Sequence, residues 1–154
     1  MTGAVVRPLE PSDADALHVV FTEPGVRQYL FDDILLTREE TQVRVAAALT
    51  HDAWVVELDG QVAGFASLRP VGQDRELTIA ISERCWGRGV AFDAARAAMR
   101  HGFEVLKLDR ILAGVDLPNQ RSHRLMARLG FAPTGETDGP KYRARTYEAL
   151  RPSA

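Results

Sequence analysis

Three shortages narrow the kinds of protein that this chain can be. It has one cysteine, Cys85, among 154 residues, which excludes an internal disulfide. It has no apolar run long enough to span a bilayer, and residues 1–10 lack the basic start and apolar core of a signal peptide. These absences predict a protein of the reducing cytoplasm with no membrane partner.

A large excess of charge of one sign is also lacking. The chain carries 19 basic and 21 acidic residues, a net charge of −2, so no overall field favours nucleic acid and no such partner is expected. Any phosphate must therefore be recognised by a local basic cluster. The histidines have no metal-ligand spacing with one another or with the cysteine, which predicts no metal site; they are His18, His51, His101 and His123.

What is present is the composition of one ordinary globular domain. Hydrophobic residues make up 45% and charged residues 26% of a chain of 17.0 kDa, which is large enough to bury a core without metals or disulfides. Internal repeats and interdomain linkers are absent from the sequence. Residues 1–154 are therefore expected to form a single domain.

Local patterns predict strands and helices in an α+β order. Thr37 and Glu40 form a capping-box pattern that opens a helix, and Asp59-Gly60 is a turn pair that β-hairpins prefer. Residues 26–36, after a break at Glu23-Pro24-Gly25, are apolar and fit either type of element. The expected strands are 4–9, 54–58, 61–68, 76–82, 110–115 and a terminal hairpin over 131–150, and the expected helices are 14–21, 37–49, one after Gly89, and 119–129.

The most informative segment reads Arg-Cys-Trp-Gly-Arg-Gly-Val-Ala from Arg84 and joins a strand to a helix. Gly87 and Gly89 let the backbone approach a ligand, and the unpaired N–H groups of the first helical turn attract an anion. The arginines, Arg84 and Arg88, add donors that suit phosphate. A Walker loop lacks its lysine here, and the third glycine of a dinucleotide fingerprint would fall on Phe92.

The helix after this turn has a face of small residues that would let it lie close to a sheet. Core packing alone also explains such a face. Its members are Ala91, Ala94, Ala95, Ala98 and Gly102. Further along, Pro118 is expected to end the strand over 110–115 where pairing with its neighbour is interrupted.

The whole chain resembles the Gcn5-related N-acetyltransferase family. The strand at 76–81 followed by Trp86-Gly87-Arg88-Gly89 is similar to that family's core strand and pyrophosphate loop, and Asn119 to Ser122 with Leu129-Gly130-Phe131 is similar to its asparagine helix and exit. Segments 26–30 and 37–40 are similar to the branch that acetylates ribosomal-protein alanine and serine N-termini. The resemblance implies a mixed, mostly antiparallel sheet of about seven strands with about four flanking helices.

The same resemblance implies an acetyl-CoA-dependent enzyme that needs no metal. It would move the acetyl group to a primary amine, of a protein N-terminus or a small molecule, by direct transfer in a ternary complex. Backbone N–H groups from Ala80 to Ser82 would polarise the thioester. The implied coenzyme contacts are Ile79, Ala80, Ile81, Arg84, Cys85, Trp86, Gly87, Arg88, Gly89, Val90, Ala91, Asn119, Ser122 and Arg124.

Two residues are the candidates for catalysis. Glu76 matches the family's strand glutamate and would orient the amine or accept its proton through water; the alternative is a carboxylate that is solvated or ion-paired beside Arg75. Ser122 lies on the apolar stripe of its helix and would assist the thiol; the alternative is a hydroxyl bonded to the carbonyl four residues earlier. Met126 stands where many relatives have a tyrosine acid, and it has no proton to donate.

Several other features leave alternatives open. The arginines of the last helix, Arg121, Arg124 and Arg128, either reach a coenzyme phosphate or form a solvated basic face. The aromatic side chains of Tyr29, Phe31 and Trp54 either line an acceptor pocket or pack in the core. A homodimer is compatible with the sequence. The alternative to an enzyme is a non-catalytic module that binds acyl-CoA or regulates.

Overall fold

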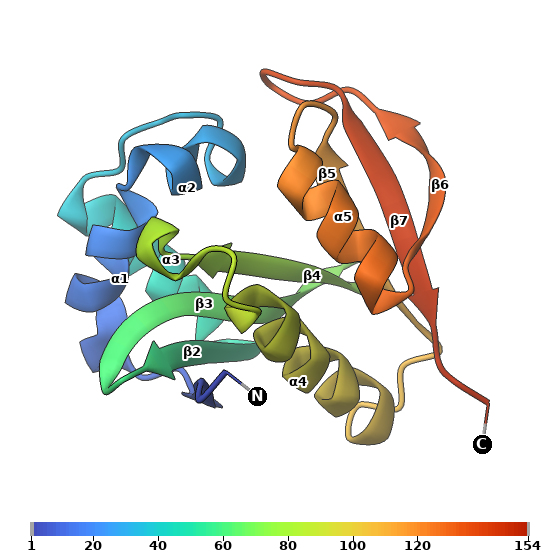
Figure 1. The fold of residues 1–154 in the computed structure, drawn as a ribbon, viewed down its shortest axis with the longest axis horizontal. Helices are drawn as coiled ribbons and strands as arrows, with labels where there is room; N and C mark the ends of the chain where they lie inside the picture. Colours follow the sequence, from blue (N-terminus) through green and yellow to red (C-terminus); the bar gives the residue numbers. More distant parts are fainter. Residues whose placement is uncertain (1, 154) are drawn as a thin grey trace.

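Seven strands form one mixed sheet, and the computed structural model describes residues 2–153 of the chain. Their spatial order is β1-β2-β3-β4-β5-β7-β6, and each pair of neighbours is antiparallel except β4 and β5, which are parallel (Figure 1). The strands are β1 (Val5–Pro8), β2 (Asp52–Leu58), β3 (Gln61–Val71), β4 (Asp74–Ile81), β5 (Arg110–Asp116), β6 (Ala132–Thr137) and β7 (Ala144–Leu150).

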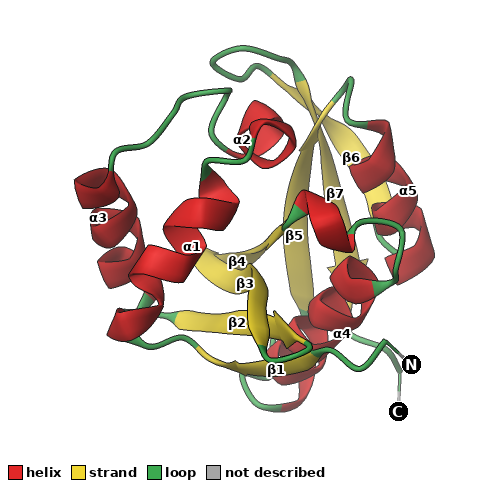
Figure 2. Cartoon of the chain, turned by 60° about the vertical axis from the view of Figure 1, so that its left-hand side comes forward, coloured by secondary structure: helices red, strands yellow, loops and turns green. Residues whose placement is uncertain are grey.

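Helices cover both faces of this sheet (Figure 2). They are α1 (Ala14–Phe21), α2 (Pro24–Leu30), α3 (Arg38–Ala48), α4 (Val90–Glu104) and α5 (Gln120–Leu129), with short 3₁₀ turns at Pro11–Asp13 and Glu83–Cys85. Val55 packs in the core beneath α1–α3, whereas the next residue, Val56, packs against α4. Because successive strand side chains point to opposite faces, α1–α3 lie on one face and α4 on the other.

The local signals of the sequence are confirmed where they concern turns and caps. Thr37 Oγ1 accepts a hydrogen bond from the N–H of Glu40 at 3.1 Å, and Glu40 Oε1 accepts one from the N–H of Thr37 at 2.9 Å. Asp59 and Gly60 have φ of 54° and 76°, the left-handed values that a two-residue hairpin turn needs. Gly130 ends α5 with φ of 86°.

The prediction for residues 23–36 needs correction. The expected break at Glu23-Pro24-Gly25 is instead the start of α2, with Pro24 in the first turn, where its missing N–H costs nothing. This helix makes five in place of the four expected. Gly25 is required because a Cβ there would lie 2.6 Å from Cη2 of Trp86. The close approach joins α2 to the glycine turn.

The small-residue face of α4 does bring that helix close to the sheet. Ala94, Ala95 and Ala98 are fully buried, and a Cβ on Gly102 would lie 3.0 Å from Cδ1 of Ile111 on β5. The short distance leaves room for no larger side chain. The N-terminus of α4 is therefore held firmly beside the end of β4.

The parallel strands β4 and β5 pair at one position only, Glu76 opposite Leu112. Beyond this position, β4 continues to Ile81 and β5 to Asp116, and the two strands do not pair with each other again within residues 2–153. The interruption begins well before Pro118, which follows the end of β5, so that proline is not its cause. The two halves of the sheet therefore separate toward the carboxyl ends of β4 and β5.

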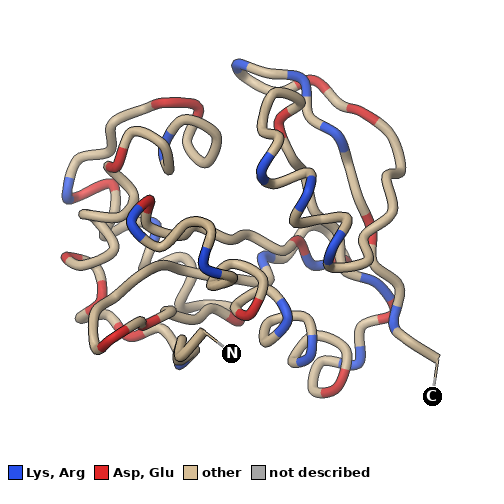
Figure 3. The backbone as a smooth tube through the Cα atoms, viewed as in Figure 1, with Lys and Arg blue, Asp and Glu red and all other residues tan. Residues whose placement is uncertain are grey.

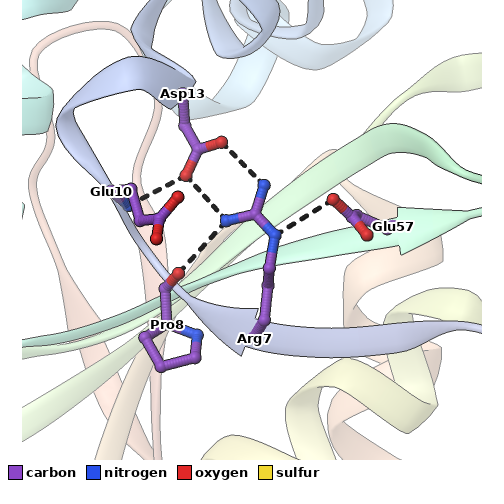
Figure 4. A network of polar contacts seen from close by, with 5 residues as sticks. All are labelled: Arg7, Pro8, Glu10, Asp13 and Glu57. Carbon is purple, nitrogen blue, oxygen red and sulfur yellow. Dashed lines mark hydrogen bonds and ion pairs between the residues drawn. The ribbon is translucent and has the colours of Figure 1, made fainter.

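An ionic network fixes the start of the chain to the sheet (Figure 4). Arg7 Nη1 and Nη2 donate to the carboxylate of Asp13 at 2.9 and 2.8 Å, and Arg7 Nε donates to Glu57 at 3.0 Å. The hydrogen bonds from Arg7 lower the pKa of the Asp13 carboxyl below its usual value. One guanidinium thus links β1, the turn before α1, and β2.

Candidate active site

The separation of β4 and β5 produces a cleft of about 900 Å³. Its walls come from both strands, from α2 and α3 on one face, and from α5 and the start of α4 on the other. Of the predicted site residues, those that line it are Glu76, Ile79, Ala80, Ile81, Cys85, Trp86, Gly87, Gly89, Val90, Ala91, Asn119, Ser122 and Arg124. A cleft at the carboxyl ends of parallel strands is a common ligand site in sheets of this kind.

The glycine turn has the backbone conformation that an anion site needs. Gly87 and Gly89 have φ of 74° and 79°, and Gly89 is the N-cap of α4. Residues with a side chain rarely adopt these values. The N–H groups of the first turn of α4 have no partner within that helix and carry the positive end of its dipole. The turn is therefore suited to bind phosphate.

The two arginines of this turn lie away from the cleft. Arg84 donates from Nη2 to the carbonyl oxygen of Val62 at 2.9 Å. Arg88 is half-exposed, and its Nη2 lies 4.0 Å from a carboxylate oxygen of Asp59. Neither is among the residues that line the cleft. The predicted phosphate contacts of these two side chains have no support from their positions.

Three arginines of α5 form a basic wall on one side of the cleft. They are Arg121, Arg124 and Arg128, which all line the cleft. Figure 3 shows basic residues on successive turns of this helix. The guanidinium of Arg121 lies 3.3 Å from the ring centroid of Trp86, and that of Arg128 lies 4.5 Å from the centroid of Phe92. All three arginines are also exposed, so their positions fit both alternatives, a contact with a coenzyme phosphate and a solvated basic face. Desolvation and the neighbouring Arg124 lower the pKa of Arg121.

The edge of β4 that faces β5 supplies free backbone groups. Past Glu76 this edge has no strand partner among the described residues, so its N–H and C=O groups border the cleft. Backbone groups alternate along a strand, and those of Ser82 face β3, so Ile79 and Ile81 are the residues whose backbone faces this edge; the carbonyl oxygen of Ile81 already accepts from Trp86 Nε1 at 2.8 Å. Ser82, expected to add a third N–H, instead donates it to the carbonyl oxygen of Ala63 at 2.7 Å. The N–H of Ser82 is therefore not free for a ligand.

Asn119 and Ser122 form a local pair at the start of α5. Asn119 Oδ1 accepts a hydrogen bond from the N–H of Ser122 at 3.3 Å, and Asn119 Nδ2 donates to Ser122 Oγ at 3.0 Å. The serine oxygen is thus an acceptor toward Asn119, which leaves its own proton for another acceptor. Met126 is buried and lines the same wall, so it supplies no acid there.

Glu76 has an ion-pair partner, although a different one from that considered in the sequence. Its Oε1 lies 2.8 Å from Nη2 of Arg69 on β3, whereas Arg75 pairs with Asp52 at 2.9 Å. The other oxygen, Oε2, lies 4.0 Å from the position that a Cβ on Gly114 would take. Glu76 therefore reaches across the strand junction toward β5 and lines the cleft there.

Three polar residues of this region carry no clear signal in the sequence. Glu23 accepts hydrogen bonds from Ser82 Oγ and from the N–H of Glu83, both at 2.7 Å, and so braces the start of the glycine turn. His51 lines the cleft, and burial, with Arg75 nearby, lowers its pKa. Asp116 is the last residue of β5 and also lines the cleft.

The aromatic residues divide between the two alternatives. Tyr29 and Phe31 line the cleft from the α2 side. Trp54 packs against His101 at a centroid distance of 5.1 Å, in the core beneath α4, so for Trp54 the core-packing alternative holds. Among residues 2–153, no three His, Cys, Asp or Glu side chains gather as metal ligands would. No helix in that range has both the length and the apolar character needed to cross a bilayer.

The fold and the cleft are those of a ligand-binding α+β domain, and comparison with known proteins identifies its family. The acetyltransferase (GNAT) domain matches residues 4–132, and the chain belongs to this family. It is an acetyl-CoA-dependent N-acetyltransferase that acts on an amine. A curated relative is spermidine N(1)-acetyltransferase of Escherichia coli K12, 31% identical over 137 residues that cover 85% of this chain and 74% of that protein. Both the predicted fold class and the family are thereby confirmed.

Solved structures of the family show the same fold. An acetyltransferase of the GNAT family from Bacillus anthracis superposes with a TM-score of 0.86 at 23% identity, over 96% of this chain and 95% of that one. Spermidine N-acetyltransferase from Vibrio cholerae, in complex with CoA and spermine, gives 0.81 at 19% identity over 98% and 97%. A ribosomal L7/L12 α-N-protein acetyltransferase, of the branch that the sequence resembles, gives 0.81 at 18% over 97% and 91%.

Proposed function

We propose that this enzyme transfers the acetyl group of acetyl-CoA directly to a primary amine of a small polyamine, with both substrates bound in the cleft. The observation that carries the proposal is the separation of β4 from β5, which gives one cleft with walls on both faces of the sheet. The α4–α5 side carries the glycine turn and three arginines. The other side carries two cations that are already engaged, Arg44 over the Phe31 ring at 4.5 Å and Arg69 with Glu76 at 2.8 Å. It also carries Asp116 and Tyr29, and a carboxylate and an aromatic ring suit a cationic amine.

The coenzyme side fits a nucleotide pyrophosphate. Backbone approach at Gly87 and Gly89 and the N-terminus of α4 would hold its charge, with Arg121 and Arg124 as additional donors across the cleft. The free edge of β4 at Ile79 and Ile81 would bind the amide-containing arm and polarise the thioester carbonyl. Cys85 is buried in the turn and is assigned no chemical step.

Direct transfer requires three things of the residues in the cleft. The amine nitrogen, unprotonated, attacks the thioester carbon; the C–S bond breaks; and the sulfur takes up a proton. Glu76 would orient the amine or accept its proton through water, and the hydroxyl of Ser122 would donate toward the sulfur. Close placement of the two substrates makes a covalent acetyl-enzyme unnecessary.

The acceptor is tested by the release of free CoA. Purified enzyme with acetyl-CoA is supplied in turn with spermidine, spermine, single amino acids and short peptides with alanine or serine at the N-terminus. We expect turnover with the polyamines, and mass spectrometry of the product should show one added acetyl group. Turnover with peptides alone would overturn the polyamine assignment. Coenzyme binding without turnover for any amine would overturn catalysis itself.

The same proposal includes the setting of the enzyme. Residues 1–154 would form one N-acetyltransferase domain that works in the cytoplasm, where a reducing environment keeps Cys85 as a thiol. Its partners would be acetyl-CoA and the amine, with no nucleic acid.

A further inference from the structure

Two carboxylates face the same side of the sheet where β4 and β5 separate. Ile111, Ala113 and Val115 of β5 pack in the core beneath α4 and α5. Since side chains alternate along a strand, Asp116 projects to the opposite face, toward α2. Glu76 lies on that face too, because it shares the alternation of Ala80, which packs in the core beneath α1–α3.

Strand β5 places no side chain in the space between these two carboxylates. Gly114 lies on the same face of β5 as Asp116 and carries no Cβ, and Glu76 Oε2 lies 4.0 Å from where that atom would be. Gly114 and Asp116 both line the cleft. A ligand can therefore contact the β5 backbone between the two acidic groups.

Asp116 is the carboxylate of the pair without a cation. Its Oδ2 is buried and has no hydrogen-bond partner among the described residues. No ion pair of Asp116 is found among the described residues; Arg27 Nε, which also lacks a hydrogen-bond partner, lies 3.3 Å from the carboxylate of Asp33, and Lys141 Nζ lies 3.8 Å from it. Desolvation, with Asp32 nearby, raises the pKa of Asp116. Asp116 as a whole is half-buried, but a buried carboxylate oxygen without a donor is costly, and a bound cation would remove that cost.

We propose that Asp116 binds a second ammonium group of the acceptor, one that is not acetylated, and so makes the enzyme selective for diamines and polyamines over monoamines. This proposal rests on the proposed function and adds the residue that binds the second positive charge of the substrate. Asp32, on the loop after α2, contributes to the same negative field. Glu76, whose charge is already shared with Arg69, is left to face the reacting amine.

The test compares acceptors that differ by one charge. A linear diamine and the monoamine of equal chain length are assayed with wild type, Asp116→Asn and Asp116→Glu, and the exposed Asp15→Asn serves as control. In Asp116→Asn we expect KM for the diamine to rise about 10- to 100-fold, the range for loss of one charge-assisted hydrogen bond. The KM for the monoamine and for acetyl-CoA should change less than about twofold, and added salt should reduce the diamine effect. Asp116→Glu should retain part of the diamine preference.

A binding measurement separates this proposal from the proposed function. Calorimetry titrates the diamine into the CoA complex of each variant and needs no turnover. Weaker diamine binding in Asp116→Asn supports the role of Asp116 even if no amine is acetylated. Equal diamine affinity in wild type and Asp116→Asn, or equal changes for diamine and monoamine, would overturn it.

Discussion

Gly89 combines a backbone requirement with a position at the ligand. Its φ of 79° is left-handed, and it caps α4 at the cleft. We predict that Gly89→Val weakens acetyl-CoA binding by at least about tenfold, because the β-branched side chain disfavours the turn and obstructs the phosphate. Isothermal calorimetry measures the change. Gly60→Val is the matched control, since Gly60 has φ of 76° in the β2–β3 hairpin turn and should be strained without losing coenzyme affinity. Equal affinity in a folded Gly89→Val would remove the turn from the coenzyme site.

Substitutions of Glu76 and of Ser122 should lower activity with different dependences on pH. If Glu76 assists deprotonation of the amine, Glu76→Gln should lower kcat/KM mainly at lower pH, where the amine is protonated. Ser122→Ala should lower turnover across the range, because the thiol must always be protonated. A true general base is worth roughly 10²- to 10⁴-fold, whereas orientation alone is worth less. Full pH–rate profiles of both variants decide this. A Glu76→Gln enzyme as active as wild type at every pH would leave proximity as the main catalytic effect.

The link between β1 and the turn before α1 is an element-scale interaction. Asp13 is nearly fully buried, with 7% of its side chain exposed, and Arg7 is its partner. We predict that Asp13→Asn destabilises the fold by about 2 kcal/mol at neutral pH, the value of a charged hydrogen bond lost in a partly buried site. Because the folded-state pKa of Asp13 is lowered, this stability is present above its unfolded pKa of about 3.9 and is lost as pH falls below that value. Urea unfolding from neutral to acid pH measures the difference.

The exposed neighbour provides the contrast for that experiment. Asp15 pairs with Arg38 at 2.9 Å, but 76% of its side chain is exposed, so Asp15→Asn should change stability by less than about 0.5 kcal/mol. If both substitutions cost the same, or if the cost of Asp13→Asn persists at low pH, the ion pair with Arg7 does not hold the element in place.

Helix α5 is fixed by a histidine that holds three elements together. His123 Nε2 lies 3.1 Å from the carbonyl oxygens of Asp116 and Leu117, which can only accept, so this nitrogen carries a proton. His123 Nδ1, 2.6 Å from the hydroxyl of Tyr147 on β7, then accepts from it when the ring is neutral. The end of β5, α5 and β7 are thus joined behind the cleft. This arrangement sets where the α5 arginines lie.

At the scale of the whole molecule, the features that could be predicted from the sequence are those that depend on a few neighbouring residues. The hairpin at Asp59-Gly60 and the end of α5 at Gly130 depend on positive φ, which few residue types tolerate. The basic wall of the cleft and the role of Asp116 depend on where α5 docks and where β4 leaves β5. Such contacts between distant segments have no local signal. For the same reason Arg84, predicted at the ligand from its spacing, lies against β3.

The charge of the molecule is nearly balanced, so binding of an anionic coenzyme depends on local groups, which we propose are the glycine turn and the arginines of α5. We predict that Arg121→Ala and Arg124→Ala each weaken acetyl-CoA binding about 10-fold or more at low salt, with the larger loss in Arg121→Ala because its contact with Trp86 is also removed. Screening should shrink both effects as ionic strength rises. Arg100→Ala, an exposed site on α4 outside the cleft, is the matched control and should bind as wild type does. Calorimetry at two salt concentrations gives the comparison. If instead Arg84→Ala weakens acetyl-CoA binding while the α5 variants do not, the phosphates are bound by the Arg84 side chain of the glycine turn, and the α5 arginines do not contribute.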